Sequence, residues 1–158
     1  MGSHAGGWTV RVTRGAALAA LAGCVSAGSG GAWPATATAR ETVGGVAYAL
    51  EVEAWRSFQP LVGERGDPLL AIVRLVADGA LPPDAKLGRV RLQRGTDTWE
   101  GELREESPRA AGSARAEFML RDGPRWSAGD SILVMARLQV GSAPPVVLGV
   151  RTAIARVE

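Results

Sequence analysis

The segment Val46-Ala47-Tyr48-Ala49-Leu50-Glu51-Val52-Glu53 alternates between large apolar residues and small or charged ones. Successive side chains of a β-strand point to opposite faces, so Tyr48 and Leu50 share a face while Glu51 and Glu53 share the other. This period of two predicts a strand that is buried on one side and solvated on the other.

Two longer runs, Leu69 to Val76 and Ile132 to Val140, are almost continuously apolar. Such runs indicate strands in the middle of a sheet. Alternation returns in four further stretches, residues 88–94, 98–103, 114–121 and 146–157, and segments rich in Gly, Pro and Asp separate all of these. No stretch shows a helical period, so the pattern predicts seven antiparallel strands.

This arrangement resembles the immunoglobulin-like and fibronectin-type sandwiches found on bacterial surfaces, over about Val46 to Val157. The resemblance implies an all-β, seven-stranded antiparallel sandwich for residues 45–158. A single Cys allows no disulfide within the chain, so packing must hold this domain together.

The start of the chain has the pattern of an export signal. Arg11 and Arg14 are the only charged residues among the first 39, and they precede nine uncharged residues, Gly15 to Gly23. Nine helical residues rise about 14 Å, roughly half of a hydrocarbon core of about 30 Å. The run is therefore too short to span a membrane and is expected to be a signal peptide, residues 1–23.

Leu21-Ala22-Gly23-Cys24 resembles the lipobox of bacterial lipoproteins at all four positions. The resemblance implies cleavage between Gly23 and Cys24, and a diacylglycerol on Cys24 that anchors the protein to a membrane of the cell envelope. Val25 after the Cys slightly favours the outer membrane or cell surface. The alternative is simple secretion, with cleavage after Ala27.

Residues 24–44 are rich in Gly, Ser, Ala and Thr. This composition is too poor in large apolar side chains to offset the entropy of ordering, so it predicts a flexible linker.

The charge balance argues against nucleic-acid binding. Apart from Arg11 and Arg14 the 16 remaining basic residues equal the 16 acidic ones, so the mature chain has no cationic surplus. His4 is the only histidine and lies in the export segment, which excludes a serine triad or a His-based zinc site. We therefore expect no enzyme and no cofactor; a carboxylate-dependent glycosidase is the remaining enzymatic alternative.

Three residues are candidates for partner contact: Trp55, Arg125 and Trp126. An indole beside a guanidinium suits a sugar face or a protein hot spot. Core packing is the competing interpretation for both Trp residues, because the domain is poor in Phe and Tyr. Glu100 and Glu102 lack the spaced ligands of a calcium loop, so no metal site is expected.

The sequence thus predicts a lipid-anchored, non-catalytic binding or assembly module that meets an envelope protein through a sheet edge or an end loop. The alternative is a sandwich-type proteinase inhibitor that presents a loop such as residues 122–130 to an extracellular protease.

Overall fold

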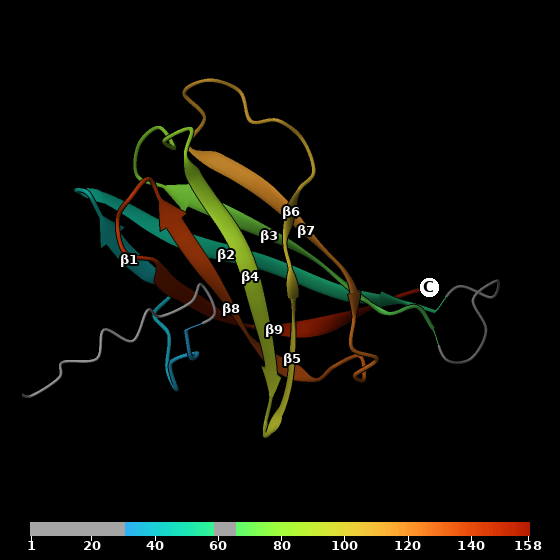
Figure 1. Ribbon diagram of the computed structural model, residues 1–158. Helices are drawn as coiled ribbons and strands as arrows, with labels where there is room; N and C mark the ends of the chain where they lie inside the picture. Colours follow the sequence, from blue (N-terminus) through green and yellow to red (C-terminus); the bar gives the residue numbers. More distant parts are fainter. Residues whose placement is uncertain (1–30, 59–65) are drawn as a thin grey trace, which may run out of the picture. The chain divides into compact units, whose positions relative to one another are not determined.

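The computed structural model describes residues 31–58 and 66–158. The chain divides into two units, Met1–Ala32 and Trp33–Glu158, and all described strands belong to the second. These residues form strands and turns without any helix (Figure 1). Accordingly, none of the described segments is a helix that could cross a membrane.

The described residues form nine strands. In chain order they are β1 (Arg40–Val43), β2 (Val46–Ser57), β3 (Leu69–Ala77), β4 (Ala85–Arg94), β5 (Asp97–Glu102), β6 (Arg104–Glu105), β7 (Arg115–Gly123), β8 (Ser131–Val140) and β9 (Val146–Val157). Seven of them correspond to the predicted strands. The other two, β1 and β6, are only four and two residues long.

The strands form one mixed sheet in the order β5-β4-β8-β9-β2-β3-β7-β6, with β1 attached to β2. The apolar strands β3 and β8 each have a neighbour on both sides, as their composition predicts. All neighbours are antiparallel except β2 and β9, which run parallel from Ala54↔Ile154 to Ser57↔Val157. The predicted purely antiparallel pattern fails here because the first long strand and the last one, far apart in sequence, run in the same direction.

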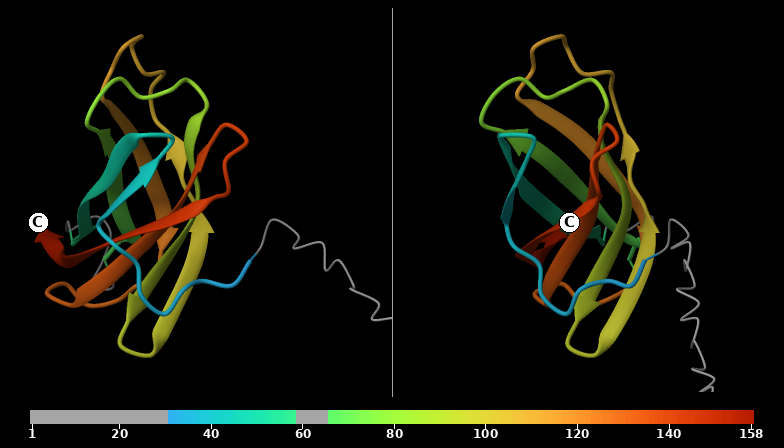
Figure 2. Two further views of the ribbon diagram at one scale, coloured as in Figure 1. Left: turned by 90° about the vertical axis from the view of Figure 1, so that its left-hand side faces the viewer. Right: turned by 60° about the vertical axis from the view of Figure 1, so that its left-hand side comes forward.

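Strand β9 joins the two halves of the sheet. Its residues up to Ala153 pair with β8, and its residues from Ile154 onward pair with β2. At the other end of the order, β5 leads directly into β6, which pairs with β7. The sheet therefore curls and nearly closes into a barrel (Figure 2).

Side chains from both halves of the sheet form one apolar core. The largest fully buried ones are Tyr48, Leu69, Leu75, Leu92, Leu120, Ile132, Met135, Leu138, Leu148, Ile154, Val73 and Val90. In β3 the core face includes Leu69, Val73 and Leu75, while the alternate residues are only partly buried. The period of two in the sequence thus becomes the two faces of the strand.

The structured unit begins earlier than the domain expected from the sequence. Thr38 forms a bridge with Leu148, and its carbonyl accepts a hydrogen bond of 2.8 Å from Gly149 N–H. A Cβ on Gly149 would lie 2.6 Å from Ala37 Cβ, so Gly is needed for this approach. The guanidinium of Arg137 also lies 4.7 Å from the Trp33 ring. The second half of the stretch predicted as linker is therefore attached to β9, β2 and β8.

Candidate functional site

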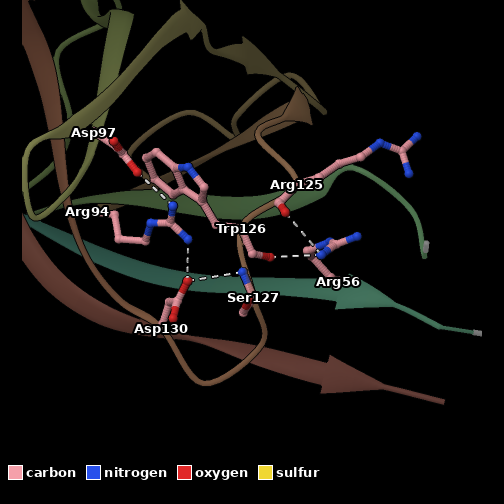
Figure 3. A network of polar contacts seen from close by, with 7 residues as sticks. All are labelled: Arg56, Arg94, Asp97, Arg125, Trp126, Ser127 and Asp130. Atoms are coloured by element: carbon pink, nitrogen blue, oxygen red, sulfur yellow. Dashed lines mark hydrogen bonds and ion pairs between the residues drawn. The ribbon is translucent and has the colours of Figure 1, made fainter. Parts of the chain in front are cut away.

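The segment with Arg125 and Trp126 is the loop of residues 124–130, which connects β7 to β8. Trp126 is partly buried and packs against the core. The guanidinium of Arg94 lies 5.1 Å from its ring and pairs with Asp97 at 2.7 Å and Asp130 at 2.8 Å (Figure 3). The indole therefore lies against an ion-paired cation beside the turn of the β4–β5 hairpin.

Asp130 fixes the end of this loop. Its carboxylate accepts a hydrogen bond of 3.0 Å from Ser127 N–H. Gly129, with a φ of 92°, adopts a backbone conformation that L side chains rarely take, and its N–H donates to the Ile154 carbonyl at 2.8 Å. Hydrogen bonding to the charged form, first from Arg94 and then from Ser127, lowers the pKa of Asp130.

Arg56 of β2 holds the loop from below. It is 5% exposed, and its guanidinium donates 2.8 Å hydrogen bonds to the carbonyls of Asp67 and Trp126 and a longer one of 3.4 Å to Arg125 (Figure 3). Burial lowers its pKa, as does the nearby charge of Arg125, while Asp67 raises it. A buried cation with three carbonyl partners is a structural brace, and sequence reasoning missed it because Arg56 follows the more conspicuous Trp55.

Trp55 lies away from this network. Neighbouring residues of a strand point to opposite faces, so Trp55 is on the outside of β2 while Arg56 is inside. Trp55 lines a shallow groove of about 510 Å³ where β2 and β9 run parallel, together with Ile72, Thr152 and Ala155. Arg125 and Trp126 thus lie in one loop whose carbonyls Arg56 binds, whereas Trp55 lies on the opposite face of β2.

A smaller cleft lies where the barrel does not close, between β5 and β7. We call it the seam cleft; it has a volume of about 250 Å³ and is lined by Trp99, Gly101, Glu102, Arg104, Met119, Arg121 and Asp122. The ring of Trp99 covers Gly101 so closely that a Cβ there would overlap it. Only Arg104 and Glu105 of β6 pair with β7, so the cleft begins where this short pairing ends.

A β-bulge shapes the β7 side of the seam cleft. Leu69 and Ala71 of β3 enclose one residue, whereas their partners Gly123 and Leu120 enclose two, which leaves an extra residue in β7. Asp122, in this bulge, has a φ of 57°, unusual for a residue other than Gly. Bulges re-aim side chains, and this one places Arg121 and Asp122 at the cleft. Two features of the sequence could have indicated this cleft: the Trp99-x-Gly101 spacing and the Asp122-Gly123 pair.

The remaining candidates are accounted for as follows. Leu21-Ala22-Gly23-Cys24 lies outside the described residues. Glu100, one of the two carboxylates considered as calcium ligands, pairs with Arg89 at 2.7 Å. Among residues 31–58 and 66–158 no group of three or more His, Cys, Asp or Glu side chains is placed to hold a metal ion.

Comparison with known proteins adds a distant structural likeness. No family model matches the sequence, and no curated protein matches it significantly. The crystal structure of a DUF4426 family protein from Pseudomonas aeruginosa PAO1 aligns with 75% of this chain and 98% of its own, with a TM-score of 0.45 and 15% sequence identity.

Replacing Arg56 by Leu tests the brace. We expect the free energy of unfolding in urea to fall by about 2–4 kcal/mol, because several buried carbonyls lose their donor. The control is Arg125→Leu, which removes an exposed side chain with one carbonyl partner, Gly66, and should cost about 1 kcal/mol or less. Equal losses for the two variants would show that Arg56 does not brace the loop.

The Arg94–Asp130 pair predicts that the stability of the fold depends on pH. Because the pKa of Asp130 is lowered by folding, its contribution to stability is complete above the ordinary Asp pKa of about 4 and declines as the pH falls through the folded value. The difference in melting temperature between the wild type and Asp130→Asn should therefore be largest near pH 6 and shrink towards pH 2. A difference that stays constant over this range would contradict the assignment.

Proposed function

We propose that the protein is a lipid-anchored binding module of the bacterial cell envelope, with an immunoglobulin-like fold and no catalytic role. The observation that carries the proposal is the seam cleft, an open site between β5 and β7, where the curled sheet does not close. Its lining combines an indole, two carboxylates and two guanidiniums. Such a mixture suits recognition of a partner better than chemistry on a small substrate.

The strand order supports the immunoglobulin-like assignment. In that fold one sheet has the order ABED and the other, with its additional strand, the order GFCC′. The run β2-β3-β7-β6 matches the first order and the run β9-β8-β4-β5 matches the second. The proposal thus treats the two runs as facing layers, with β9 and the β5–β6 segment connecting them at the sides.

The non-catalytic role rests on the placement of the ionisable groups. His4 precedes Cys24, so the mature protein has no imidazole. Glu100, Glu105 and Glu106 are each engaged by a guanidinium at 2.7–2.9 Å. Carboxylates committed to guanidiniums in this way are not free to act as an acid–base pair on a substrate.

The anchor follows from the lipobox-like residues. Several acyl chains at Cys24, at about 0.8 kcal/mol per buried methylene, would hold the domain durably at a membrane. An envelope protein within reach of the module would be its partner.

A second candidate, a proteinase inhibitor, is favoured by the rigidity of residues 124–130. Arg56 and Arg94 fix this loop from two sides, and the exposed Arg125 donates a hydrogen bond of 2.5 Å to the Gly66 carbonyl. Inhibitors gain affinity from such a pre-organised loop.

Mass spectrometry of the natively expressed protein tests the proposal. We expect an acylated Cys24 at the new amino terminus, and Cys24→Ala should move the protein from the membrane to the soluble fraction. A photo-crosslinker at Thr98, beside the seam, should capture an envelope protein that one at Glu51, on the outside of β2, does not. Exchange of residues 124–130 for a Gly-Ser loop should leave this capture unchanged.

Loss of protease inhibition on that loop exchange would favour the inhibitor instead. An unmodified Cys24 in a cytosolic protein that crosslinks to no envelope component would contradict the proposed function.

A further inference from the structure

Strand β5 is an edge strand with a defined set of free backbone groups. Leu103 N–H donates to the Gly88 carbonyl at 3.0 Å, which fixes the residues of this segment that bond to β4. Opposite residues of an antiparallel pair alternate between bonded and non-bonded, so Gly101 and Trp99 also bond to β4. The N–H and C=O groups of Thr98, Glu100 and Glu102 therefore face the opposite side, towards the seam.

No strand takes up those groups in the part of the chain that the structure describes. Strand β5 ends the strand order, with β4 as its one neighbour. On the far side of the cleft, β6 pairs only with Phe118 and Met119 of β7, so β7 is uncovered from Leu120 onward. Two strand edges thus border one cleft, and unpaired edges accept further strands.

The side chains around the cleft indicate which strand would fit. From the interior side the cleft presents the indole of Trp99. At its rim, Arg121 is paired with Glu106 at 2.9 Å. Within the described residues, Glu102, Asp122 and Arg104 form no ion pair, which leaves one uncompensated negative charge at the rim.

A second copy of this chain fits the edge poorly. Strand β5, Asp-Thr-Trp-Glu-Gly-Glu, carries three carboxylates and no cation, so a second copy of it would bring no positive charge to Glu102. Like charges directly opposite each other are destabilising. The edge is thus better matched by a different chain that carries cations.

We propose that the seam cleft binds an extended segment of a partner protein, which adds to the edge of β5 as a further strand. Alternate apolar side chains of this segment contact Trp99, and the intervening Lys or Arg side chains meet Glu102 and Asp122. This inference rests on the proposed function and gives its site and the chemistry of its partner.

The test uses the full chain in detergent and the peptide acetyl-Thr-Val-Lys-Val-Thr-Val-Lys-amide, labelled for fluorescence anisotropy. We expect Glu102→Pro, which removes an N–H that faces the seam but not one that bonds to β4, to weaken binding about tenfold. Glu102→Gln, which keeps the backbone and removes the charge, should weaken it about two- to fivefold. The same peptide with Glu in place of Lys should bind more weakly than the Lys form.

Binding that is absent up to 1 mM peptide, or equal for the wild type and Glu102→Pro, overturns the inference. If Glu102→Pro has a lower unfolding midpoint, Thr98→Pro provides the same test at the other end of the free edge. Envelope-protein capture that survives Glu102→Pro would refute the seam inference and leave the binding-module function standing. If the peptide binds at the seam but no envelope protein is captured, the seam inference stands and the proposed envelope function is refuted.

Discussion

The structure depends on the way residues 97–105 divide their backbone bonds between two distant strands. Leu103 N–H still bonds to Gly88 of β4, whereas the next residue, Arg104, already pairs with Met119 of β7. The buried side chain of Leu103 marks the crossing. Because a segment this short cannot accompany β7 for its whole length, the barrel closes at β6 and stays open beside β5. The closure and the cleft therefore have the same cause.

Local pattern was sufficient to predict the all-β class and the approximate positions of the longer strands. The period of two placed seven strands and their buried faces, and the two apolar runs identified β3 and β8 as central. It could not reveal β6 or the parallel pair of β2 and β9, because both are set by partners far away in the chain. Residues 38–43 were predicted as linker because their composition is small and polar, yet Gly149 allows the chain to approach β9 there.

The candidate site was predictable only in part. Arg125 and Trp126 lie together in a loop, but the same contacts show that Trp126 is packed beneath Arg94 and that its carbonyl is held by Arg56. Trp55 belongs to the other face of β2. The seam cleft was not anticipated, since it forms from two strands, β5 and β7, that are not consecutive in the sequence, and from a bulge that no local pattern encodes. The ion pairs also depend on strand pairing: Glu100 and Arg89 are neighbours only because β4 and β5 form a hairpin.

Amide hydrogen exchange along β5 tests most directly whether the seam edge is free. If the edge is open, the N–H groups of Gly101 and Leu103, bonded to β4, exchange slowly, whereas those of Glu100 and Glu102 exchange much faster under the same conditions. Uniformly slow exchange at all four positions would mean that β5 is paired on both sides and would contradict the account of an open seam.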